Sequence, residues 1–184
     1  MVLLKSETLP ASFIAPDFNL QSVEGKGYSL ASFSSSRVLV VAFICNHCPY
    51  VKAIEDRLIA LQREFSAHPV QFVGICSNDP TDYPDDLPHN LLKRWKAKDY
   101  GFPYLIDEDQ TVAKAYGAVC TPDLYVFNEK RQLQYHGRLD DSWQDPCKVT
   151  RRELADAVRQ LLAGQSPLPD SQPSMGCSIK WRQR

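Results

Sequence analysis

The sequence lacks any long hydrophobic run: no apolar stretch approaches the roughly 18 residues that a transmembrane helix needs. Residues 1–13, MVLLKSETLPASF, lack the apolar segment of a secretory signal peptide. No run of lysine and arginine exceeds two residues, and the formal net charge is −1. These absences argue against nucleic-acid binding and membrane insertion. We therefore expect a cytoplasmic protein with a small-molecule or protein substrate, and neither nucleic acid nor membrane as a partner.

The length and the cysteine content indicate what kind of domain the chain forms and what its cysteines do. The chain has 184 residues, 43% of them hydrophobic, which suits one domain with a full core. The cysteines are too widely spaced for a small disulfide scaffold, so in a reducing compartment they favour catalysis or metal binding. They are Cys45, Cys48, Cys76, Cys120, Cys147 and Cys177.

Apolar runs and helical spacings alternate along the chain. Residues 38–44 (VLVVAFI) and 70–76 (VQFVGIC) are continuous apolar runs, typical of strands buried on both faces. Between them, an apolar repeat at spacings of three and four predicts an amphipathic helix. Its members are Val51, Ile54, Leu58, Leu61 and Phe65. Further elements are expected as helices near residues 91–95 and 111–117, a strand over 102–107, a hairpin over 123–138, and a last helix after a capping box at 150–153.

This order predicts an α/β fold with a mainly parallel central sheet and helices on both faces. The hairpin over residues 123–138 supplies an antiparallel edge, and residues 13–33 form an N-terminal hairpin extension. We assign residues 1–164 to this domain and residues 165–184 to an irregular C-terminal tail that carries Cys177. In such sheets, functional groups gather at the carboxyl ends of the strands.

The segment Cys45-Asn46-His47-Cys48 stands at such a strand end. A c-type haem attachment needs a histidine directly after the second cysteine, where this chain has Pro49. A structural zinc site needs four ligands, and the chain has a single C-x-x-C pair, so we expect neither metal nor cofactor. Inert core cysteines are the remaining alternative. However, Pro49 suits the first helical position, and Cys48 near the N-cap would have its pKa lowered by the helix dipole and by a protonated His47. The pattern therefore favours a redox dithiol.

Residues 45–48, the Thr121-Pro122 dipeptide and the order of elements resemble the thioredoxin superfamily. The segments APDFNL, GKGYSLASF and FPYLIDEDQTVAKAYGAVCTPDLYVF are more narrowly similar to its redoxin and peroxiredoxin-like branch, the alkyl hydroperoxide reductase/thiol-specific antioxidant relatives. The resemblance covers roughly residues 10–162. It implies a thioredoxin-like fold, with Cys45 as the nucleophile, Cys48 as the resolving cysteine and Pro122 as a cis-proline that faces them.

The sequence departs from a typical peroxiredoxin, which has a proline seven residues and a threonine three residues before its reactive cysteine. Counted from Cys48, those places hold Val41 and Cys45; counted from Cys45, they hold Val38 and Ala42. The missing threonine hydroxyl argues against efficient peroxide reduction.

We predict a thiol-disulfide oxidoreductase that exchanges a protein or small-molecule disulfide or dithiol through Cys45 and Cys48, together with a cellular thiol reductant. Pro49 favours Cys48 as the attacking thiolate and the resemblance favours Cys45; we choose Cys45. His47 holds a place found in strong disulfide oxidants, so we expect a potential somewhat more oxidising than that of thioredoxin. A peroxidase that acts on peroxide and a non-catalytic redox sensor are the alternatives.

Two further cysteines are candidates for a redox role. Cys120 lies two residues before Pro122, and Cys177 lies on a tail that could fold back as a resolving arm. The loop with Asp79, Asp82, Asp85 and Asp86 lacks the spacing of a calcium loop, so we assign it to turns.

Overall fold

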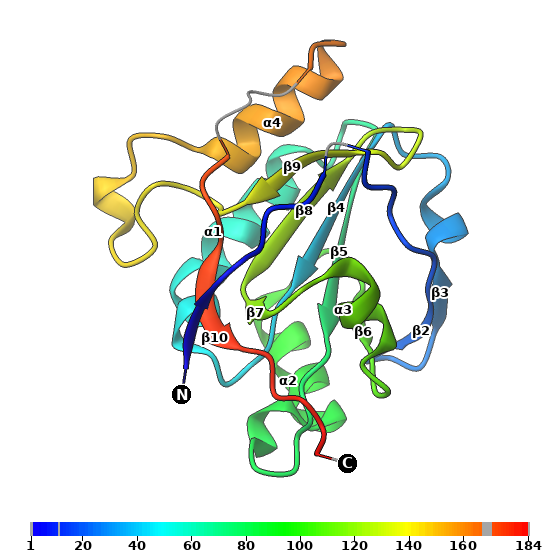
Figure 1. Cartoon of the computed structure of the whole chain (residues 1–184), viewed down its shortest axis with the longest axis vertical. Coiled ribbons are helices and arrows are strands. Elements are labelled where there is room, and N and C mark those ends of the chain that lie inside the picture. The colour runs from blue at the N-terminus through cyan, green and yellow to red at the C-terminus, as the bar shows by residue number, and fades with distance from the viewer. Residues whose placement is uncertain (1, 11, 167–170, 184) are drawn as a thin grey trace.

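A computed structural model describes residues 2–10, 12–166 and 171–183, and expectations that fall on residues 167–170 lie outside it. A seven-stranded sheet forms its centre (Figure 1). In chain order its strands are β2 (Asn19–Ser22), β3 (Gly27–Ser29), β4 (Val38–Phe43), β5 (Val70–Cys76), β6 (Tyr104–Ile106), β8 (Asp123–Phe127) and β9 (Leu133–Gly137). The spatial order is β3-β2-β6-β5-β4-β8-β9. The thioredoxin-like fold expected from the sequence is confirmed.

Parallel pairing is confined to the middle of this sheet, where β5 lies between β4 and β6. The hairpin of β8 and β9 adds an antiparallel edge next to β4. The N-terminal hairpin of β2 and β3 joins the other edge, antiparallel to β6. The sheet is therefore less parallel than the sequence indicated, because both hairpins extend it.

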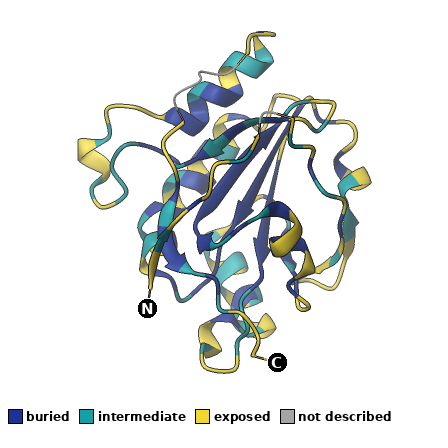
Figure 2. Cartoon of the chain, in the orientation of Figure 1, coloured by how far each residue is buried: buried dark blue, intermediate teal, exposed yellow. Residues whose placement is uncertain are grey.

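Helices cover both faces of the sheet, as predicted. They are α1 (Pro49–Glu64), α2 (Pro88–Lys98), α3 (Thr111–Tyr116) and α4 (Glu153–Leu162). All of β4 is buried (Figure 2). Alternate residues of a strand face opposite sides of its sheet. Val40 packs in the cluster that holds the apolar faces of α1, α2 and α4, whereas Val41 packs in the cluster that holds α3. The continuous apolar run thus marks a strand buried on both faces.

The start of α4 differs from the predicted capping box. The helix begins at Glu153, and its N-cap is Arg152, which makes no side-chain cap hydrogen bond. Thr150 instead donates its hydroxyl and its backbone N–H to Asp141. The Thr150 hydroxyl, which the sequence pattern predicted to cap the helix, therefore hydrogen-bonds to the Asp141 carboxylate instead.

The prediction of an irregular tail from residue 165 is wrong for residues 175–178. These residues form β10 (Met175–Ser178), which lies between β1 (Leu3–Lys5) and β7 (Cys120–Thr121) in a separate antiparallel sheet (Figure 1). The segment SMGCSIK has no alternation of apolar and polar residues that would predict a strand. It forms one because two strands that are distant in sequence, β1 and β7, pair with it.

Within the described residues, every helix is either too short or too polar to cross a lipid bilayer.

Candidate active site

The segment 45–48 links the carboxyl end of β4 to the first turn of α1. Pro49 takes the first helical position and Cys48 is the N-cap, as the sequence predicted. Both thiols lie beneath the surface, with exposed fractions of 1% for Cys45 and 0% for Cys48. A reagent must therefore reach them through a gap or through a local opening.

Thr121 contacts both cysteines of the dithiol. Its hydroxyl Oγ1 lies 3.2 Å from Cys45 Sγ. Its carbonyl oxygen accepts a hydrogen bond from the protonated Cys48 thiol at 3.1 Å. The bond between Thr121 and Pro122 is cis, as the resemblance implied. Sequence reasoning selected Pro122, but Thr121 makes the direct contacts.

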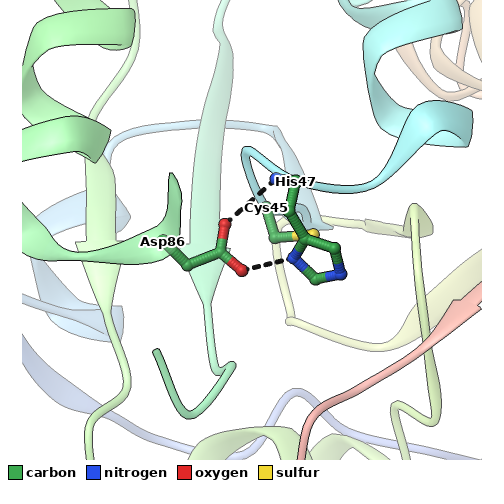
Figure 3. Close-up of side chains that lie close together, drawn as sticks. All are labelled: Cys45, His47 and Asp86. Carbon is green, nitrogen blue, oxygen red and sulfur yellow. Dashed lines mark hydrogen bonds and ion pairs between the residues drawn. The ribbon is translucent and has the colours of Figure 1, made fainter. Parts of the chain in front are cut away.

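Asp86, which the sequence analysis assigned to a turn, reaches the dithiol segment from η2 (Pro84–Asp86) (Figure 3). Its Oδ1 accepts the backbone N–H of Asn46 at 2.7 Å and that of His47 at 3.2 Å. Its Oδ2 lies 2.6 Å from Nδ1 of His47. A single buried carboxylate thus fixes both residues between the two cysteines.

The charge state of Asp86 follows from these contacts. Burial raises its pKa, but hydrogen bonds from His47, Asn78 and Asn46 outweigh that effect and leave the pKa below its usual value. The carboxylate is therefore ionised, and Nδ1 of His47 is the donor. Nε2 of His47 is buried and has no hydrogen-bond partner among the described residues.

The two thiols of the dithiol differ in acidity. A hydrogen bond from the Cys45 thiol lowers the pKa of Cys48 to about 5; burial opposes this effect, and a hydrogen bond from Cys177 adds to it. Burial, and then the hydrogen bond to Cys48, raise the pKa of Cys45 well above its usual value. Cys48 is therefore the more readily ionised of the two thiols, and it gives up its hydrogen bond to the Thr121 carbonyl when it ionises.

The remaining cysteines divide into one at the dithiol and three away from it. Cys177 of β10 lies opposite Thr121, in the same buried cluster as Cys45 and Cys48. Cys120 is equally buried but turns its thiol to the carbonyl of Pro122, at 3.8 Å. Cys76 is buried in the core at the end of β5, whereas Cys147 is exposed. The structure thus brings together Cys45, Cys48 and Cys177.

A metal ion would find donors at one place near the dithiol. One ligand atom each from Cys45, His47 and Asp86 lies within 4.8 Å of the others, the one such group in the described part of the chain (Figure 3). Nδ1 of His47 and Oδ2 of Asp86 bond to each other, and burial raises the pKa of Cys45. A metal bound here would have to displace the proton of the Cys45 thiol, whose raised pKa therefore disfavours metal binding.

A pocket of about 180 Å³ opens next to the cis-proline. Tyr50 of the first turn of α1, Pro122, Trp143 and Met175 contribute to its wall, together with Arg138. The rings of Tyr50 and Trp143 lie 4.3 Å apart, centre to centre. The pocket provides a hollow beside the dithiol segment that could hold a small molecule.

Comparison with known proteins places this arrangement in a family. A protein from Geobacillus kaustophilus is similar at 41% identity, with a TM-score of 0.95 over 100% of this chain and 98% of that chain. A hypothetical protein from Sinorhizobium meliloti 1021 is similar at 39% identity, with a TM-score of 0.94 over 98% and 99% of the two chains. A thiol:disulfide interchange protein from Chlorobium tepidum shares the fold at 19% identity, with a TM-score of 0.64 over 85% and 99%.

No protein with curated annotation matches the chain. The model of the AhpC/TSA family matches residues 13–136, which include the dithiol, Asp86 and the cis-proline. The chain therefore belongs to the AhpC/TSA family.

Proposed function

We propose that the protein is a thiol-disulfide oxidoreductase that works through Cys45 and Cys48. One observation carries the proposal: Cys48 is the N-cap of α1, and Thr121 contacts both its sulfur and that of Cys45. The N-cap position favours the Cys48 thiolate, and the shared contact keeps a second thiol close to it. Membership of a family of redox proteins supports the same reaction class.

We assign the attack to Cys48. The resemblance favoured Cys45, but burial raises the pKa of the Cys45 thiol, whereas hydrogen bonds lower that of Cys48. The Cys48 thiolate attacks one sulfur of a disulfide, forms a mixed disulfide, and releases the first substrate thiolate. The Cys45 sulfur then attacks the Cys48 sulfur, so that the Cys45–Cys48 disulfide forms and the second substrate thiol leaves. The substrate gains the two electrons that the dithiol loses.

His47 and Asp86 assist the second step. Cys45 must lose its proton to attack. One ring nitrogen of His47 lies within 4.8 Å of its sulfur, and because Nδ1 is bonded to Asp86, the proton has to pass to Nε2 after the side chains close that distance. Asp86 accepts Nδ1–H of His47 and would stabilise the imidazolium that forms. We therefore propose His47 as the proton acceptor and Asp86 as the residue that positions it.

Burial of the dithiol narrows the substrate class. With exposed fractions of 1% and 0%, neither sulfur can meet a disulfide on the surface of a folded protein while β10 is in place. Among the described residues, no cysteine lines the pocket beside Pro122 and Tyr50. A small disulfide bound there therefore reaches the Cys48 sulfur only when Met175 of β10 is displaced from the pocket wall. Small-molecule disulfides are therefore the proposed substrates, with a cellular dithiol or thiol as the reductant.

The test is a redox titration in glutathione buffers, followed by alkylation and peptide mass mapping of all cysteines. We expect Cys45 and Cys48 to pair at a potential between roughly −270 and −120 mV, the range of thioredoxin-fold proteins. Cys147→Ser is the matched control, because Cys147 is exposed and far from the dithiol in sequence. If both thiols stay unpaired while one is oxidised to sulfinic acid by peroxide, the oxidoreductase proposal fails and the peroxidase alternative takes its place.

A further inference from the structure

We propose that Cys177 is a second resolving cysteine, so that a Cys48–Cys177 disulfide is an alternative oxidised state of this centre. The inference rests on the proposed function, in which Cys48 is the attacking thiolate. It adds a third redox residue, supplied by a strand outside the segment 13–136 that the family model matches.

The register of β10 brings Cys177 to the dithiol. Cys177 pairs with Thr121 across the two strands. Thr121 in turn contacts the sulfur of Cys45 through Oγ1 and that of Cys48 through its carbonyl oxygen. Cys45, Cys48 and Cys177 belong to the same buried cluster. Thr121 therefore brings a third thiol, that of Cys177, next to the dithiol.

Several bonds hold β10 in this position. Gly176 lies so close to Thr121 that an added Cβ would meet the carbonyl oxygen at 1.9 Å. Ile179 donates its backbone N–H to Val119, and Lys180 donates its own to Oδ1 of Asn78, at 2.9 and 2.8 Å. Cys177 thus belongs to a fixed strand and is not carried on a swinging arm.

The bond of Lys180 to Asn78 also joins β10 to the segment between the cysteines. Nδ2 of Asn78 donates to Oδ2 of Asp86, which holds His47. A continuous series of hydrogen bonds therefore links Lys180 to His47 through Asn78 and Asp86. It fixes the strand that carries Cys177 relative to the dithiol segment.

The chemistry balances without an external reagent. In the mixed disulfide, the Cys48 sulfur is bonded to the sulfur of one half of the substrate, RS. The Cys177 thiol attacks the Cys48 sulfur, a bond forms between the sulfurs of Cys48 and Cys177, and the bond from Cys48 to RS breaks. The proton of Cys177 passes to RS, which leaves as RSH. The product has the same oxidation level as the Cys45–Cys48 disulfide.

Cys120 provides an internal comparison. It is as deeply buried as Cys177 and lies on β7, opposite Ser178. Its thiol faces the carbonyl oxygen of Pro122, at 3.8 Å. It should therefore remain reduced while Cys177 pairs.

The experiment removes Cys45 and exposes the protein to oxidised glutathione. In Cys45→Ser, we expect glutathione to attach to Cys48 and then to be released, leaving a Cys48–Cys177 disulfide in the peptide map. In the double variant Cys45→Ser, Cys177→Ser, glutathione should stay on Cys48. In the control Cys45→Ser, Cys120→Ser, release should match that of Cys45→Ser alone.

Three results would count against the inference, and they differ in kind. A stable mixed disulfide on Cys48 in Cys45→Ser, as long-lived as in the double variant, would overturn only the role of Cys177. Failure of the double variant to take up glutathione at Cys48 would overturn the proposed nucleophile, and this inference with it. The unsubstituted protein provides a check that does not depend on how the variants fold: mild oxidation should yield Cys48–Cys177 peptides beside Cys45–Cys48 peptides, and their absence would overturn the inference.

Discussion

Gly176 and Thr121 are in backbone contact, so close that a methyl group on Gly176 would lie 1.9 Å from the Thr121 carbonyl oxygen and 2.6 Å from its carbonyl carbon. Only glycine fits there without displacing backbone. Thr121 contacts both thiols of the dithiol. The absence of a side chain at Gly176 therefore determines how closely β10 covers those thiols.

Gly176→Ala should therefore lift β10 from β7 and expose Cys48. We expect a loss of about 1–3 kcal/mol in the free energy of unfolding, as for other overpacked sites. We also expect faster reaction of Cys48 with a bulky maleimide, and a larger share of activity on protein disulfides relative to small ones. The control is Gly27→Ala in β3, where an added Cβ meets nothing within 4 Å. Equal maleimide rates in the two variants would contradict the covering role of β10.

Asp86→Asn should lower the free energy of unfolding by about 1.5–3 kcal/mol, because an ionised acceptor of four hydrogen bonds is replaced by a neutral amide. The folded-state pKa of Asp86 is depressed, so its contribution is present above the unfolded value of about 3.9 and is lost as the pH falls through the folded value. The difference between the two proteins should therefore shrink in acid. Denaturant unfolding at a series of pH values measures it.

The matched control is Asp82→Asn, which changes an exposed carboxylate in the same loop. Its free energy of unfolding should stay within about 0.5 kcal/mol of the unsubstituted protein. A pH-independent difference for Asp86→Asn would show that the carboxylate charge is not what stabilises the segment.

Cys45→Ala should raise the pKa of Cys48 from its value of about 5, because the first of its thiol donors is removed. The pH profile of Cys48 alkylation by iodoacetamide would then shift to higher pH, towards the ordinary thiol value of about 8.5. The midpoint is the relevant quantity, since burial affects the overall rate. Cys147→Ala should leave the midpoint unchanged, and a profile for Cys45→Ala that matches it would refute the donor role of Cys45.

Arg94→Met should destabilise the fold by about 3 kcal/mol, the low end for a broken buried pair, because the buried Glu55 carboxylate loses its bidentate partner and keeps Lys98, at 3.6 Å, as a cation. Arg94 binds both oxygens of Glu55, at 2.7 and 2.5 Å, and the Glu55 side chain is 2% exposed. Arg63→Met removes a comparable pair with Asp99 that is exposed on both sides, so it should cost less than about 1 kcal/mol. Thermal unfolding of the two variants gives the comparison.

The sequence predicted the parts of the site that depend on local pattern. The buried run of β4, the proline at the first position of α1 and the dithiol between them are adjacent in the chain, so strand, helix and N-cap could be predicted together. Asp86 could not be found in this way. In an Asp- and Pro-rich loop its carboxylate looks like a turn residue, and only the fold carries it to Asn46 and His47, 39 or more positions away.

The C-terminal strand was missed for a related reason. Met175–Ser178 is short, contains glycine, and alternates neither apolar nor β-branched residues. Its strand conformation comes from hydrogen bonds to β1 and β7, which no local pattern encodes. The sequence thus marked Cys177 as a candidate but assigned it to an irregular tail.

The pairing of Leu3 with Cys177 joins positions near opposite limits of the sequence. Contacts of such high contact order close large loops, so they carry a high entropic cost and tend to form after local elements. The small sheet of β1, β10 and β7 should therefore be completed late in folding and open among the first segments under native conditions. The rate at which Cys48 reacts with a thiol reagent would then measure how often this small sheet opens. The redox centre thus reports on the pairing of the two ends of the sequence.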